Sequence, residues 1–158
     1  MTRRHEAILV AHGALVFLLG MVAGFPYAFE ILQRVDVWPI PGSVAVDVPG
    51  DVRGWRMAHL EGILNGVLLV AVGAVGSRLA LSAAQARWVV GGLLVTAWGN
   101  ILASWVAPLA AVRGLAFSGF DWNGLVYLLF IAAVVGVLVA MTLVFLGARR
   151  AARGSAPS

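Results

Sequence analysis

The 158-residue sequence contains no cysteine and no lysine, and only 11% of its residues are charged. The lack of cysteine excludes disulfide bonds, iron–sulfur clusters, thiolate metal ligands and cysteine nucleophiles. The charged share is about half that of an ordinary soluble domain, whereas 61% of the residues are apolar and the mean hydropathy is +0.96. This composition excludes a water-soluble α/β enzyme and indicates an integral membrane protein.

The positive charge comes from arginine alone. Eleven arginines give a formal net charge of +4 and a pI near 11.1, a value that many nucleic-acid-binding proteins share. Most of the arginines, however, stand at the ends of apolar segments, as they do in membrane proteins. We therefore expect a lipid bilayer as the surroundings and no nucleic-acid partner.

Four apolar runs have the length of about twenty residues that is needed to cross a hydrocarbon core of about 30 Å. They lack the alternation of membrane strands, and backbone amides in lipid must be bonded within their own segment, so we expect helices. The sequence predicts an all-α fold, an integral membrane four-helix bundle that forms one domain over residues 1–153, followed by a disordered tail at 154–158. The predicted helices cover residues 7–29, 55–75, 84–110 and 124–146.

The arginines near the helix ends also predict an orientation. Seven belong to the two termini and the connector between the second and third helices, whereas four belong to the other side, where five acidic residues accompany them. Because cytoplasmic segments of membrane proteins are enriched in arginine, we expect both termini in the cytoplasm and the protein in the inner, cytoplasmic membrane. The seven are Arg3, Arg4, Arg78, Arg87, Arg149, Arg150 and Arg153.

The longest connector, residues 31–54, holds proline- and glycine-containing turn signals at 38–42 and 49–51. Between them, residues 43–48 alternate in polarity, which is typical of a strand. We expect a short extracytoplasmic strand or hairpin-like loop between the first two helices, lying over the mouth of the bundle.

Ionisable residues inside a membrane are costly, so His12, His59 and Glu61 are the first candidates for function. For His12 we expect an imidazole that is hydrogen-bonded to a neighbouring helix. For Glu61 we expect a side chain that reaches the membrane interface or pairs with an arginine such as Arg56.

His59 belongs to a stripe of small residues on the second helix. Two interpretations of this stripe are open. Since Gly62 and Gly66 form a Gly-x-x-x-Gly pair, the simpler one is close packing against another helix. In the other, a flat macrocycle lies on the glycines, His59 Nε2 ligates its iron and Trp55 stacks at its rim. At 100° per residue the stripe lies within about 40° of one direction and comprises Trp55, His59, Gly62, Gly66, Leu69 and Gly73.

The third helix carries a polar ladder, Thr96, Asn100 and Ser104, at a spacing of four residues. Such side chains commonly bridge membrane helices, but they would also suit a wall that orients a polar atom of a substrate. Asn65, an amide in the middle of the second helix, requires a partner or a ligand when buried. No catalytic Ser-His-Asp set, zinc motif or phosphate-binding loop is visible.

A group of short motifs around His59 points to a known family. The segment Gly54–His59, Gly-Trp-Arg-Met-Ala-His, is followed by the triplet Leu-Asn-Gly at 64–66. In these motifs, and over most of its length, the chain resembles the styrene oxide isomerases. Further matching triplets are 11–13 (Ala-His-Gly), 48–50 (Val-Pro-Gly), 98–100 (Trp-Gly-Asn) and 113–115 (Arg-Gly-Leu).

Styrene oxide isomerases are small membrane proteins that convert aryl epoxides to aldehydes by a Meinwald-type rearrangement. They assemble as trimers and use haem b with a histidine axial ligand. The resemblance implies an isomerase for a small apolar epoxide, with ferric haem b held by His59 and with Asn65 orienting the epoxide oxygen. It favours the macrocycle interpretation of the stripe, in which Trp55, Gly62 and Gly66 contact the cofactor.

One position departs from the family. Its active-site tyrosine falls on Ser104, which we place in the candidate site together with Asn100. The departure leaves a second function open, namely a non-enzymatic haem-binding membrane protein of the same fold that has lost or changed the reaction.

The spacing of His59 and Asn65 bears on assembly. Six residues turn a side chain by about 120° around a helix and advance it by about 9 Å. A ligand histidine occupies one side of its haem, and an amide on the same helix has no easy route to the other side. Together with the trimers of the family, this predicts a homotrimer with each haem at a subunit interface, between His59 of one chain and Asn65 of the next.

Overall fold

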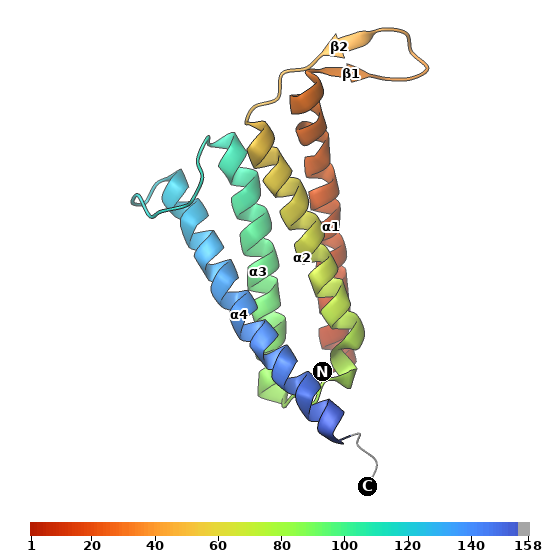
Figure 1. Cartoon of the computed structure of the whole chain (residues 1–158), viewed down its shortest axis with the longest axis vertical. Coiled ribbons are helices and arrows are strands. Elements are labelled where there is room, and N and C mark those ends of the chain that lie inside the picture. Colours follow the sequence, from red (N-terminus) through yellow and green to blue (C-terminus); the bar gives the residue numbers. More distant parts are fainter. Residues whose placement is uncertain (155–158) are drawn as a thin grey trace.

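The computed structural model describes residues 1–154. Within this range four helices are long and apolar enough to cross a membrane, and an antiparallel hairpin joins the first two (Figure 1). The predicted all-α membrane bundle, with a hairpin-like loop between its first two helices, is confirmed. The elements are α1 (Arg3–Leu32), β1 (Arg34–Asp36), β2 (Ser43–Ala45), α2 (Val52–Val75), a short 3-10 helix η1 (Gly76–Arg78), α3 (Ala83–Leu109) and α4 (Trp122–Gly154).

Some predicted helix boundaries are corrected. Helix α1 exceeds the predicted 7–29, and α4 exceeds the predicted 124–146, at both ends. Hydropathy detects only the apolar part of a helix, whereas backbone hydrogen bonding continues through polar turns outside the hydrocarbon. Gly154, the first residue of the predicted disordered tail, ends α4, and residues 155–158 lie outside the described residues.

Each long helix begins at a side chain that accepts a hydrogen bond from a backbone N–H of the first turn. Such caps satisfy donors that the helix itself leaves without a partner. They are local sequence signals, and they fix where each membrane-spanning segment starts. The acceptors and donors are Thr2 with His5, Asp51 with Gly54, Ser82 with Gln85, and Asp121 with Gly124.

Helices α1 and α2 approach closely through glycines. A Cβ atom placed on Gly62 would overlap the backbone of Gly20. A similar contact joins α3 and α4, where a Cβ on Gly92 would lie 2.7 Å from the carbonyl oxygen of Gly136. Small residues allow such approach, which drives helix association where no hydrophobic effect operates. The bundle consists of two tight pairs, α1–α2 and α3–α4, with α2 beside α3 (Figure 1).

Helix α4 buries only a narrow seam. Its buried side includes Val126, Ala133, Ala140 and Gly147, which are spaced by seven residues and so lie on one helix face. Most of its larger apolar side chains are exposed. A wide apolar surface of the bundle is therefore available to lipid or to another subunit.

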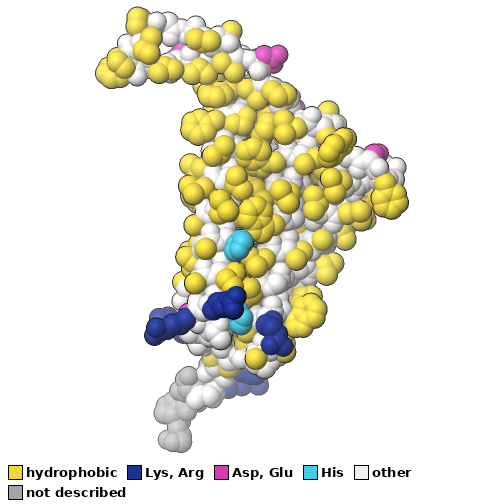
Figure 2. Space-filling view, turned by 180° about the vertical axis from the view of Figure 1, so that it is seen from behind, with side chains coloured by type: hydrophobic (Ala, Val, Ile, Leu, Met, Phe, Trp, Pro, Cys, Tyr) yellow, Lys and Arg dark blue, Asp and Glu magenta, His cyan; other side chains and the backbone are white. Residues whose placement is uncertain are grey.

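The two ends of the bundle differ in charge. The N-terminus and the C-terminal end of α4 lie at one end, and the hairpin lies at the other (Figure 1). Figure 2 shows arginine side chains gathered near the end that holds the termini, while most of this face is apolar. This is the asymmetry from which the cytoplasmic position of the termini is predicted, and that orientation stays a prediction.

Candidate functional site

His59 lies in α2 against α1 and is partly exposed. Its Nδ1 atom is 2.8 Å from the carbonyl oxygen of Gly20. Because a carbonyl oxygen only accepts hydrogen bonds, the neutral imidazole carries its proton on Nδ1 and its lone pair on Nε2. Among residues 1–154, Nε2 has no hydrogen-bond partner. The contact with Gly20 therefore leaves Nε2 as the ring nitrogen that could bind a metal ion.

This arrangement fits an axial ligand of haem. A haem needs few protein ligands because the macrocycle supplies four nitrogens to the iron. A metal ion held by side chains alone needs several ligands, and the described part of the chain contains no cluster of three His, Asp or Glu residues that could hold one. Ligating histidines commonly donate their second ring N–H to a backbone carbonyl, as His59 does to Gly20.

Three residues of α1 that the sequence analysis does not single out surround His59. Gly20 supplies the carbonyl oxygen, and a Cβ on Gly24 would lie 3.0 Å from the Nδ1 atom. The Tyr27 ring stacks on the imidazole, with centroids 6.2 Å apart and planes inclined by 26°. Their spacing places them on one face of α1, which is a readable signal. That this face meets His59 depends on the pairing of α1 with α2, which one sequence does not give.

His12 has the structural role expected for it. The Trp98 indole N–H of α3 donates to His12 Nδ1 at 3.0 Å, and the two rings meet edge to face. An indole N–H is only a donor, so the neutral His12 carries its proton on Nε2 and has no free lone pair there. The expected hydrogen bond to a neighbouring helix is confirmed. Unlike His59, His12 therefore has no ring nitrogen with a free lone pair.

The glycine stripe of α2 is a packing surface. Gly62 faces Gly20, and a Cβ on Gly66 would lie 2.7 Å from the backbone nitrogen of Phe17. Both glycines are buried, so the packing interpretation is confirmed. In this subunit α1 covers the face of Gly62 and Gly66 on which a macrocycle is expected to lie, so this packing does not support their assignment to cofactor binding, which stays a prediction.

Trp55, which the sequence predicts at the rim of a macrocycle, is packed inside the subunit. The side chain is only 4% exposed. Its indole N–H donates to the carbonyl oxygen of Pro49 at 2.9 Å, and its ring packs edge-on against Trp105. Trp55 therefore ties the connector before α2 to α3, and its ring is enclosed within its own subunit.

A chain of hydrogen bonds links Glu61, Asn65 and Asn100 inside the bundle. Asn65 Nδ2 lies 2.8 Å from both the backbone oxygen and the carboxylate Oε2 atom of Glu61. Asn100 Nδ2, on α3, lies 3.4 Å from Asn65 Oδ1. Glu61 does not pair with Arg56 among the described residues; its partner is Asn65.

These hydrogen bonds determine which N–H groups of Asn65 and Asn100 remain free. Two acceptor atoms of Glu61 occupy both N–H groups of Asn65, and turning the amide over would bring its oxygen against them. Asn65 therefore presents its oxygen to Asn100. An amide nitrogen carries two N–H groups, so Asn100 keeps one donor beyond its bond to Asn65.

The polar ladder of α3 does not form one wall. The Thr96 hydroxyl lies 2.9 Å from the carbonyl oxygen of Ala133 on α4, which confirms its expected role as a bridge between helices. Ser104 is fully buried, and its hydroxyl donates to the carbonyl oxygen of Ile101 in its own helix. Only Asn100 faces α2. A spacing of four residues drifts by about 40° around a helix, which separates these directions.

His59 and Asn65 face different neighbours. His59 contacts α1 through Gly20, whereas Asn65 contacts α3 through Asn100. The rotation of about 120° expected from six residues of helix accounts for this difference. The histidine and the amide thus belong to two different faces of the same subunit.

Comparisons with known proteins agree with the resemblance of the motifs. A family model described as styrene oxide isomerase matches residues 5–149. A styrene-oxide isomerase of Pseudomonas fluorescens is 25% identical over 118 residues, which cover 74% of this chain and 69% of that protein.

Proposed function

Because the chain belongs to the styrene oxide isomerase family, we propose that it is a haem-dependent membrane isomerase that rearranges a small apolar epoxide into an aldehyde or another carbonyl compound. The observation that carries this proposal is the geometry of His59. Its Nδ1 is held by Gly20, its Nε2 is available, and it stands in the motif that the chain shares with the family.

His59 would hold haem b through Nε2, while the carbonyl of Gly20 and the ring of Tyr27 keep the imidazole in place. When bound, ferric haem supplies a Lewis acid that withdraws electrons from the epoxide oxygen. A partly exposed ligand at the surface of one subunit suits a cofactor that is shared with a second subunit.

The rearrangement requires no external reactant. One C–O bond of the epoxide breaks, positive charge develops on that carbon, and a hydride moves to it from the carbon that keeps the oxygen. The carbonyl forms there, and no proton or electron enters or leaves. A site built from amides in an apolar bundle suits this chemistry, because it excludes the water that would trap the cation as a diol.

The amide of Asn100 orients the epoxide oxygen in this proposal, and Asn65 acts through it. Glu61 occupies both N–H groups of Asn65, and Asn65 in turn fixes Asn100 through its oxygen. The remaining N–H of Asn100 is then the donor offered to the epoxide oxygen. Glu61 and Asn65 act as positioning residues for this donor.

A homotrimer would complete the site. His59 and Asn65 face different neighbouring helices, so a ligand from one chain and an amide from the next meet if subunits pack around a symmetry axis. The exposed apolar surface of the bundle leaves room for such contacts.

The second function, haem binding without isomerisation, is favoured by Ser104. It stands where the family has its active-site tyrosine, it is fully buried, and its hydroxyl is bonded within its own helix. This side chain offers no hydroxyl to a substrate. If the family reaction depends on that hydroxyl, the chain binds haem and leaves epoxides unchanged.

One experiment separates the two functions. The detergent-solubilised protein is examined by visible absorption and then incubated with a panel of aryl and terpene epoxides, with the His59→Ala variant as the control. We expect a Soret band and carbonyl products, with a substrate preference that differs from that of a tyrosine-bearing relative. A Soret band without turnover on any epoxide would favour the second function, and a protein that binds no haem would refute both.

A further inference from the structure

The hairpin between α1 and α2 exposes large apolar side chains at its tip. Val37 is 53% exposed, Trp38 is 91% exposed and Ile40 is 67% exposed. The tip has no covering element among the described residues. Exposed tryptophan is typical of the boundary between a membrane and water, where an aromatic ring meets both environments.

The strands of the hairpin are amphipathic. The antiparallel register pairs Val35 with Val44 and Asp36 with Ser43. Paired residues share a face and successive residues alternate, so one face carries valines and the other carries polar side chains. On the polar face, Arg34 and Asp36 form an ion pair, with Arg34 Nε 3.2 Å from Asp36 Oδ2. The hairpin therefore has an apolar face, a polar face with compensated charge, and an apolar tip.

The height of the hairpin above the apolar part of the bundle corresponds to the lipid headgroup layer. The apolar run of α1 ends at Phe29, and β1 begins at Arg34. Five residues at the rise of a helix correspond to about 7 Å, which matches the headgroup layer of about 5–8 Å on each side of the hydrocarbon. Figure 1 shows the hairpin running roughly perpendicular to the bundle axis and projecting sideways beyond α1, rather than over the mouth of the bundle where the sequence predicts it.

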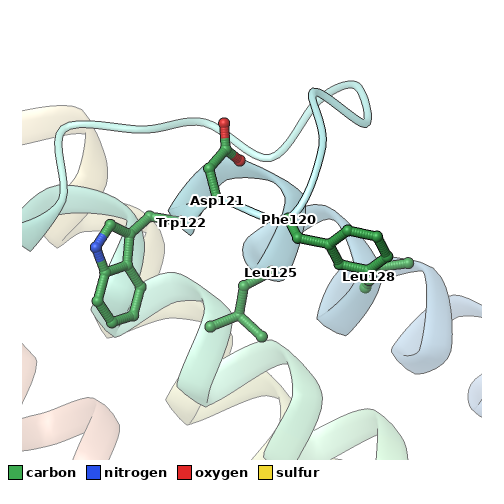
Figure 3. Close-up of a pocket in the computed structure, with 5 residues that line it drawn as sticks. All are labelled: Phe120, Asp121, Trp122, Leu125 and Leu128. Atoms are coloured by element: carbon green, nitrogen blue, oxygen red, sulfur yellow. The ribbon is translucent and has the colours of Figure 1, made fainter.

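The α3–α4 connector marks the same boundary on another side of the bundle. Phe120 is 99% exposed and Trp122 is 61% exposed, and they flank an apolar hollow of about 420 Å³ over Leu125 and Leu128 (Figure 3). Asp121 stands between them. Its carboxylate accepts from the Gly124 N–H and the Ser118 hydroxyl, which lower its pKa and keep it charged. Charge and aromatic rings side by side are expected where a helix enters the membrane.

From these observations we propose that the hairpin, residues 34–46, is an interfacial anchor: it lies in the headgroup layer with its valine face toward the acyl chains and with Trp38 and Ile40 inserted at the boundary. The occupant of this apolar surface is phospholipid. Four observations support this assignment. The hairpin lies at the level of the headgroups, it runs sideways, its two faces differ in polarity, and its charges are paired. It does not depend on the reaction that the protein catalyses.

The absence of cysteine permits a direct test. A single Ile40→Cys variant is labelled with a polarity-sensitive fluorophore and reconstituted in phosphatidylcholine vesicles. Ser43→Cys, on the polar face of the same hairpin, is the matched control. Emission is quenched either by iodide equilibrated across the vesicles or by lipids that carry a spin label just below the headgroup.

We expect the Ile40 probe to emit at shorter wavelength than the Ser43 probe, to be quenched several-fold less by iodide, and to be quenched strongly by the spin-labelled lipid. Equal iodide quenching at both positions would place the tip in water and overturn the proposal. Protection from both quenchers, together with cross-linking between Ile40→Cys chains, would show that another subunit covers the tip and would overturn it as well. Circular dichroism and gel filtration confirm that each labelled variant keeps the fold.

Discussion

The Glu61 carboxylate accepts a hydrogen bond from Asn65 at 2.8 Å, and the Glu61 backbone carbonyl accepts a second one from the same nitrogen. Both N–H groups of Asn65 are therefore directed at Glu61, so its oxygen alone faces Asn100. This relationship changes the role that the motif suggests for Asn65. In the proposed function, the amide donor offered to a substrate oxygen is therefore that of Asn100, on α3.

The first prediction concerns that donor. Asn100→Ala removes a hydrogen bond to an oxygen on which negative charge develops, a bond worth about 1.5–3 kcal/mol. We expect kcat to fall roughly tenfold to a hundredfold, while the haem spectrum stays unchanged. The control is Thr96→Val, one turn away, which removes the bond to Ala133 on α4 and should lower stability but not kcat. An Asn100→Ala enzyme with full kcat would show that its amide does not act on the substrate.

The second prediction concerns the haem ligand. His59→Ala should remove most of the Soret band of the purified protein while the bundle remains in the membrane, because the Nε2 lone pair is lost. His12→Ala is the matched control, since its Nδ1 already accepts from Trp98. It should keep the haem and lose stability. Loss of haem in His12→Ala together with its retention in His59→Ala would reverse the assignment.

The third prediction tests the glycine stripe. Gly62→Ala places a Cβ onto the backbone of Gly20 and should force α1 and α2 apart, which costs about 1–3 kcal/mol. Gly91→Ala in α3, where an added Cβ meets no atom within 4 Å, should be neutral or stabilise the helix. Unfolding in mixed detergent micelles measures both variants. If Gly62→Ala keeps full stability but shifts the Soret band, then Gly62 contacts the haem after all.

The fourth prediction concerns orientation. A reporter that is fluorescent only in the cytoplasm should give a signal when fused after Ser158. The reason is that seven arginines belong to the two termini and to the connector between α2 and α3. A reporter inserted at Gly42, in the hairpin turn at the other end of the bundle, should remain dark. The opposite pattern would place the termini outside the cytoplasm.

The sequence predicts the architecture well, because membrane spans and caps depend on nearby residues. Twenty apolar residues require a helix in lipid, and the caps at Asp51 and Ser82 are local signals. The site is predicted less well, because it depends on which helices meet. Gly62 and Gly66 suit a macrocycle or a helix equally in sequence, and only the structure shows that α1 packs against them.

The same reason explains what the sequence misses. Tyr27 stacks on His59 from another helix, so no spacing within α2 indicates it. Glu61, by contrast, precedes Asn65 by one helical turn, and that spacing of four residues is a readable signal for a hydrogen bond. An intramembrane carboxylate one turn from an amide is better interpreted as its partner than as an interfacial charge.

The last prediction concerns the sharing of the site between subunits. His59 is directed toward α1 and Asn65 toward α3, so a haem held by His59 has no amide of the same α2 on its other side. If each haem lies between His59 of one chain and the Asn65–Asn100 pair of the next, a His59→Ala chain and an Asn65→Ala chain fail in complementary ways. Alone, the first should be inactive because it lacks haem, and the second should bind haem but turn over at least about tenfold more slowly, because Asn100 has lost the residue that positions it. Co-expressed with two different affinity tags and purified through both, they should regain part of the activity, because some interfaces combine an intact ligand with an intact amide. Doubly tagged oligomers that contain haem but show no turnover would refute the shared site, and so would a stable monomer that binds haem and isomerises an epoxide.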